Sequence, residues 1–82
     1  MVTKTYVSTP DNIHASADVL KLSEGWQVNL FDSSHERLWA IVDIDIKGGA
    51  GISKQCKGHG YSDWVLIDAA KCALNAHINK GT

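Results

Sequence analysis

Two stretches in the middle of the chain alternate between apolar and polar residues, which is the pattern of a half-buried strand. The first covers residues 26–31, and its apolar row is Trp26, Val28 and Leu30. The second covers residues 38–46, and its apolar row is Leu38, Ala40, Val42, Ile44 and Ile46. A shorter and more polar strand is expected over residues 52–57, after a glycine-rich turn at 48–51 that can adopt positive φ. The pattern predicts three antiparallel strands.

The N-terminal part of the chain has a helix-start signal at Thr9, Pro10 and Asp11. A hydroxyl can cap a helix, proline fits its first turn, and a carboxylate stabilises its positive end. A helix is therefore expected over residues 10–22. Residues 19–22 also fit a strand that turns at the following glycine, so helix and strand both remain open there.

The C-terminal part of the chain predicts a second helix, with Ser62 as its cap and Asp63 in its first turn. Its apolar stripe, at spacings of three and four, is Leu66, Ile67, Ala69, Ala70, Ala73, Leu74 and Ile78. The alanines favour a helix and allow it to lie close to a sheet, and Gly81 is a natural end.

These elements predict an α+β two-layer sandwich in the order α-β-β-β-α, with both helices on one face of a three-stranded antiparallel sheet. The chain of 82 residues has the length of a single domain, residues 1–82. Its apolar content of 44% and charged content of 21% are typical of a globular protein. A core this small leaves little room for an enclosed substrate pocket, so we expect neither an enzyme nor a cofactor.

The charges are unevenly distributed along the chain. The net charge of −1 argues against a protein that is basic throughout, as many nucleic-acid binders are. Residues 1–46 hold three cations against seven carboxylates, a net charge of −4, and residues 47–82 hold five against two, a net charge of +3. One acidic and one basic surface are expected. Without a long apolar run or a signal core, a cytoplasmic location away from membranes is predicted.

Two segments resemble the family of double-stranded RNA-binding domains. Gly58-His59-Gly60-Tyr61-Ser62 is similar to the glycine turn that opens the last helix of that family. Asp68-Ala69-Ala70-Lys71-Cys72-Ala73-Leu74 is similar to the alanine-rich stretch of the same helix. Ser33-Ser34-His35 is similar to the loop before the family's second strand. The resemblance covers roughly residues 10–80 and implies the α-β-β-β-α order.

The chain departs from this family where the last helix begins. The family places lysines there that contact phosphates, whereas this chain reads Asp63-Trp64-Val65-Leu66-Ile67. Duplex recognition depends on such phosphate contacts, and each lost cation weakens it. The resemblance therefore implies a fold of this kind that is used for binding a protein. In size and acidic character the chain is also similar to small phage-encoded inhibitors such as anti-CRISPR proteins.

Aromatic and acidic residues are the expected contacts with a protein partner, because such residues combine large contact area with charge. They are Trp64, Tyr61, Trp39, Asp43 and Asp45. The sequence thus predicts a small non-enzymatic protein-binding module that inhibits a nucleic-acid-handling complex.

The alternative hypothesis is a weak binder of double-stranded RNA or DNA. Its contacts would be a lysine patch at residues 47–59 and a loop histidine, namely Lys47, Lys54, Lys57, His59 and His35. A zinc site is left open by the residue types Cys56, His59, Cys72 and His77. We expect the two cysteines to be free thiols. A homodimer is also left open, because the third strand has an exposed edge.

Overall fold

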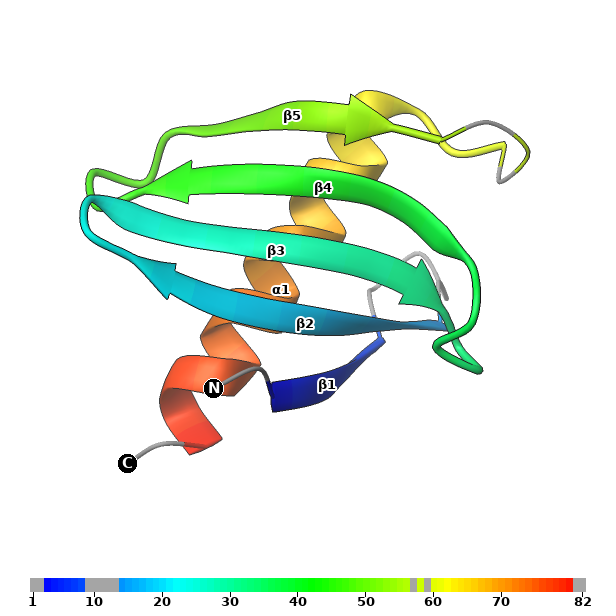
Figure 1. Ribbon diagram of the computed structural model, residues 1–82, viewed down its shortest axis with the longest axis horizontal. Helices are drawn as coiled ribbons and strands as arrows, with labels where there is room; N and C mark the ends of the chain where they lie inside the picture. Colours follow the sequence, from blue (N-terminus) through cyan, green and yellow to red (C-terminus); the bar gives the residue numbers. More distant parts are fainter. Residues whose placement is uncertain (1–2, 9–13, 57, 59, 81–82) are drawn as a thin grey trace.

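The computed structural model of the protein describes residues 3–8, 14–56, 58 and 60–80. The described part is a small α+β domain in which an antiparallel sheet is followed by one C-terminal helix (Figure 1). Its elements are β1 (Thr3–Ser8), β2 (His14–Leu22), β3 (Gly25–Asp32), β4 (Leu38–Asp45), β5 (Ala50–Gln55) and α1 (Asp63–Lys80).

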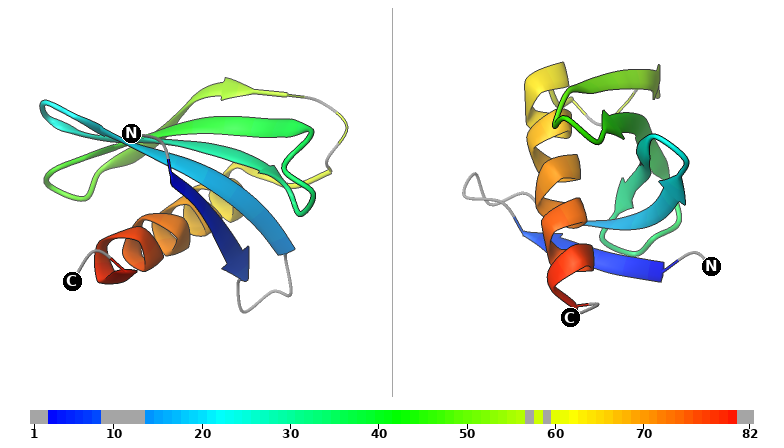
Figure 2. Two further views of the ribbon diagram at one scale, coloured as in Figure 1. Left: turned by 60° about the horizontal axis from the view of Figure 1, so that its bottom comes forward. Right: turned by 90° about the vertical axis from the view of Figure 1, so that its left-hand side faces the viewer.

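The sheet is a meander in which each strand pairs with its neighbour in the chain. The spatial order is β1-β2-β3-β4-β5, and all four pairings are antiparallel. The sheet is twisted, and α1 crosses one of its faces from β5 towards β1 (Figure 2). The other face has no helix over it within the described residues.

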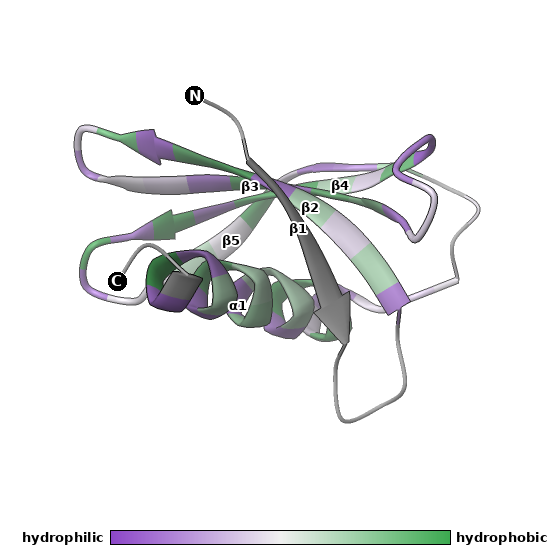
Figure 3. Cartoon of the chain, turned by 90° about the horizontal axis from the view of Figure 1, so that it is seen from below, coloured by the Kyte–Doolittle hydropathy of each residue, from purple (hydrophilic) through white to green (hydrophobic). Residues whose placement is uncertain are grey.

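The core lies between α1 and the sheet face that is turned towards it. Val19, Val28 and Val42 are register neighbours across three strands, and all three are buried. The rest of the inward row is Ala15, Ala17, Leu30, Ala40 and Ile44. From α1 come Leu66, Ala69, Ala70, Ala73 and Leu74. Three alanines among these let the helix approach the sheet closely, and Figure 3 shows the resulting two layers from below.

The predicted N-terminal helix is wrong for the residues that the structure describes. Residues 14–22 form β2, and the predicted start signal at residues 9–11 lies outside the described residues. The sheet has five strands rather than three, because β1 and β2 precede the predicted ones. Ala15, Ala17 and Val19 are buried at a spacing of two, which satisfies a strand between two partners. The pairing of β2 with a strand on each side is more favourable than a helix whose apolar face would consist mainly of small residues.

The predicted middle strands and the C-terminal helix are confirmed, with changes at their ends. β4 ends at Asp45, so Ile46 lies in the turn and is 63% exposed instead of buried. Near the end of α1, Ile78 is 43% exposed rather than part of the core. β5 begins at Ala50, two residues earlier than predicted, because residues 46–49 are enough to form the β4–β5 turn. Gly48 supplies the positive φ of that turn, at 92°.

Candidate functional site

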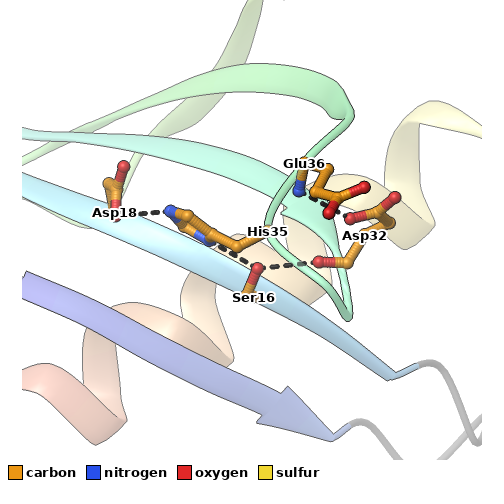
Figure 4. A network of polar contacts seen from close by, with 5 residues as sticks. All are labelled: Ser16, Asp18, Asp32, His35 and Glu36. Carbon is orange, nitrogen blue, oxygen red and sulfur yellow. Dashed lines mark hydrogen bonds and ion pairs between the residues drawn. The ribbon is translucent and has the colours of Figure 1, made fainter.

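A serine, a histidine and an aspartate lie in contact on the sheet face away from α1 (Figure 4). Ser16 and Asp18 are on β2, and His35 is in the loop between β3 and β4. Ser16 Oγ lies 2.6 Å from His35 Nδ1 and 2.7 Å from the backbone oxygen of Asp32. His35 Nε2 lies 3.0 Å from Asp18 Oδ1. These are the residue types of a hydrolytic triad, within hydrogen-bonding distance of one another.

The loop that carries His35 is built around the side chain of Asp32. Asp32 Oδ1 accepts hydrogen bonds from Ser34 Oγ at 2.9 Å and from the backbone N–H of Glu36 at 3.0 Å. The backbone N–H of Glu36 is the main reason that the pKa of Asp32 lies below its ordinary value. His35 has a φ of 64°, which is uncommon without glycine, and its ring packs on Phe31 with centroids 4.2 Å apart. These contacts hold the imidazole over β2.

The geometry does not support Ser16 as a nucleophile. Its side chain has no exposed surface, so a substrate carbonyl has no access to Oγ in this conformation. The hydroxyl of Ser16 has hydrogen-bond partners within the protein in either protonation state of His35 Nδ1. It donates to His35 Nδ1 when that nitrogen is unprotonated, or donates to the Asp32 oxygen while accepting from a protonated Nδ1. The network therefore fastens the β3–β4 loop to β2.

A different kind of surface lies at the opposite end of the sheet, where the β2–β3 and β4–β5 turns are side by side (Figure 1). The backbone N–H of Ile46 donates to the backbone oxygen of Glu24 at 3.2 Å, which ties the two turns together. Leu22 is 44% exposed and Ile46 is 63% exposed. We call the residues at this end the hairpin-end surface: Leu22, Glu24, Asp43, Asp45 and Ile46.

The hairpin-end surface surrounds an open hollow of about 540 Å³. Gly25 lies between Leu22 and Asp45 in one row across β2, β3 and β4, and Gly51 lies on β5 beyond Asp43, so both glycines line the hollow without side chains. A Cβ atom on Gly25 would lie 2.2 Å from the backbone oxygen of Ile44, so the two strands require a glycine there. An adjoining hollow of about 380 Å³ is lined by Glu24, Asp45, Ile46 and Lys47.

Asp45 has a structural role besides its place in this surface. Its Oδ1 accepts the backbone N–H groups of Lys47 at 2.9 Å and Gly49 at 2.8 Å. A short carboxylate that accepts from the residues just after it stabilises a tight turn. Asp45 therefore ends β4 and shapes the β4–β5 turn, which positions Ile46 outside the core.

The five predicted partner contacts do not form one surface. Trp39 and Tyr61 are half-buried against the core, with ring centroids 5.1 Å apart. Trp64 is 65% exposed in the first turn of α1. Asp43 and Asp45 are exposed near the far end of β4, which is roughly 13–20 Å from Trp39 at the usual rise of a strand. Only the two aspartates belong to the hairpin-end surface.

The predicted lysine patch is also divided. Lys47 is in the β4–β5 turn, whereas Lys54 is near the other end of β5, opposite Ile41. His35 is paired with Asp18. Lys57 and His59 lie outside the described residues. No continuous basic surface is assembled by the described members of this set.

The cysteines of the predicted zinc set are free thiols, and both are half-buried. The pKa of Cys72 is raised, because burial disfavours the thiolate and the charge of Asp68 adds to this effect. A zinc ligand must be a thiolate, so this environment disfavours metal binding at Cys72. Among the described residues, which exclude His59, no group of three or more His, Cys, Asp or Glu residues is arranged to hold a metal ion.

Comparison of the chain with protein-family models, curated proteins and solved structures found no match. The resemblance to double-stranded RNA-binding domains thus depends on its motif residues alone and stays a prediction. Within the described residues, no helix combines the length and the apolar character needed to cross a membrane.

Proposed function

We propose that the protein is a non-enzymatic protein-binding module that contacts its partner through the hairpin-end surface. The observation that carries this proposal is the pair Leu22 and Ile46, two exposed aliphatic side chains on adjacent turns beside an open hollow. The carboxylates of Glu24, Asp43 and Asp45 line this hollow or the adjoining one. An apolar centre with a polar rim is the usual composition of a protein interface.

Physical magnitudes support this surface over the network of Ser16, Asp18 and His35. Complete burial of one leucine or isoleucine side chain contributes ~1.5–3 kcal/mol, and both side chains retain roughly half of their area for a partner to cover. A backbone hydrogen bond from Ile46 to Glu24 joins the two turns, and Asp45 Oδ1 accepts two more N–H groups within the β4–β5 turn, so little order has to be imposed on binding. By contrast, Ser16, Asp18 and His35 already bond to one another.

A capture experiment with matched variants tests this proposal. The immobilised protein would be incubated with an extract of its source cells, and the retained proteins would be quantified by mass spectrometry. The variants are Leu22→Ser with Ile46→Ser, Trp64→Ala, and Ile78→Ser as the control on the distant end of α1. We expect a partner that the wild type, Trp64→Ala and Ile78→Ser retain and the double variant loses. A partner lost with Trp64→Ala and retained by the double variant would overturn the proposal.

Three sequence hypotheses stay predictions beside this proposal. Inhibition of a nucleic-acid-handling complex is one function that such binding would serve. Binding of double-stranded RNA or DNA has no support from the placement of Lys47 and Lys54. Association of two copies at the edge strand β5 is disfavoured by the lysine on that strand and by the irregular register between β4 and β5, both of which hinder edge pairing.

A further inference from the structure

We infer that the hollow of the hairpin-end surface binds an arginine side chain of the partner. This inference deepens the proposed function and depends on it. It starts from the unbalanced charge of the region. Glu24, Asp43 and Asp45 line the hollow or its neighbour, and none of them forms an ion pair with another described residue. Among the described residues, Lys47 is the one cation that lines either hollow.

Two other lysines lie near this end of the sheet. Lys71 lines a separate hollow with Ile44 and Gly48, and Lys21 contacts an aromatic ring. Lys21 Nζ lies 4.0 Å from the centre of the Trp26 ring, on the face that α1 shares. Such a position is a cation–π contact and keeps the ammonium away from the carboxylates. Three carboxylates against one lysine therefore leave the hollow with an excess of negative charge, and a cationic partner group complements it.

Asp43 is the carboxylate most available to a ligand. Its register neighbours are Gln27 on β3 and Gly51 on β5, so no cation lies directly across from it on either side. Its side chain is exposed and has no hydrogen bond to another described residue. Asp45 differs, because its Oδ1 is occupied by two backbone N–H groups. Asp43 is therefore the expected anchor for the incoming charge.

The shape of the hollow favours arginine over lysine. Leu22, Gly25 and Asp45 form one row across β2, β3 and β4 on the sheet face away from α1, and Asp43 and Gly51 belong to the next row. Gly25 therefore leaves backbone without a side chain between Leu22 and the carboxylates of β4, and Gly51 leaves the β5 side of Asp43 open. The methylene stem of an arginine can lie along Leu22, and its planar guanidinium can form two parallel hydrogen bonds to Asp43. A lysine ammonium lacks this paired geometry and is more strongly hydrated.

Titration of the ¹⁵N-labelled full chain with a small arginine peptide tests the inference. The probe is acetyl-Leu-Arg-amide, and its control is the same peptide with citrulline, which keeps the shape and removes the charge. We expect saturable amide shifts at residues 22–25 and 43–51 with the arginine peptide at concentrations up to ~10 mM, the range for a fragment of this size. We expect at least a threefold weaker response with citrulline.

Matched variants separate the site from general charge attraction. Asp43→Asn should weaken binding at least threefold, whereas Asp68→Asn on α1 removes the same charge elsewhere and should leave the affinity unchanged. Equal binding of the citrulline peptide, equal binding to Asp43→Asn, or the absence of binding would each overturn the inference. If a partner in the capture experiment still depends on Leu22 and Ile46, such a result contradicts the arginine site alone. If no partner depends on them, the proposed function fails as well.

Discussion

The two ends of the sheet use polar residues in opposite ways. At one end, Ser16, Asp18 and His35 satisfy one another and hold the β3–β4 loop, which leaves them little to offer a ligand. At the other end, Leu22 and Ile46 are exposed beside carboxylates without ion pairs among the described residues. The serine, histidine and aspartate, although they are the residue types of a catalytic triad, therefore have a structural role. The hairpin-end surface has side chains that are available to a partner. Whether the polar groups already have hydrogen-bond partners distinguishes the two ends better than the types of residue present.

The largest effect is expected for Gly25→Ala at the hairpin end. The new Cβ atom would lie 2.2 Å from the Ile44 oxygen, so β3 and β4 would have to separate locally. We expect a loss of about 3–5 kcal/mol in the free energy of unfolding, measured by urea denaturation. Gly51→Ala is the matched control, because a Cβ there meets nothing within 4 Å. Equal losses in the two variants would show that the close approach at Gly25 is unimportant.

A smaller effect is expected for Ser16→Ala at the other end of the sheet. The substitution removes a buried hydroxyl and leaves His35 Nδ1 without its partner. We expect a loss of about 1–3 kcal/mol in the free energy of unfolding. Ser53→Ala is the control, since its exposed hydroxyl makes a single long contact of 3.4 Å with the Ile41 oxygen. A loss no greater than that of the control would contradict a fastening role for the network.

Replacement of the exposed aliphatic residues should affect stability less than either of these changes. Leu22→Ser and Ile46→Ser remove side chains that already contact water. Each should change the free energy of unfolding by no more than about 0.5–1 kcal/mol, which thermal or urea unfolding would measure. A loss of several kcal/mol would place these side chains in the core and remove them from the interface.

The smallest effect is expected from acid titration of Asp32. Its pKa is lower in the folded chain than in the unfolded chain, so its contribution to stability is present above the ordinary value near 3.8. That contribution is lost as the pH falls through the lowered value. Asp32→Asn should therefore lower the melting temperature at pH ~7, and the difference from the wild type should diminish towards pH ~2. A difference that is independent of pH would contradict a role for the charge.

The sequence predicts the elements whose apolar spacing is unambiguous and fails where small residues fit two spacings. β3 and β4 have apolar rows at a strict spacing of two, α1 has an apolar stripe at spacings of three and four, and all three elements are confirmed. In β2, Ala15 and Ala17 are compatible with either a helix or a strand, and pairing with β1 and β3 decides between them. Such pairing involves residues of the neighbouring strands, which lie outside the segment, so the spacing within β2 alone does not predict it.

The candidate site is only partly predictable for the same reason. The aspartates of the hairpin-end surface were visible as polar positions in an apolar alternation. Ile46 looked like the next member of the buried row, and only the turn shaped by Asp45 places it outside. Ser16 and His35 are 19 residues apart, and their contact follows from the β2–β3 register and the loop after it. A contact of this kind cannot be recognised from a short sequence motif.

The meander order of the sheet has a consequence for how the chain folds. Each strand pairs with the next one along the chain, so the sheet can grow one hairpin at a time with little loop-closure entropy lost at each step. The helix is different, because α1 packs across the sheet as far as β1, at the opposite end of the described chain. Docking of α1 is the step that closes the longest loop, and it joins the last segment of the chain to the first.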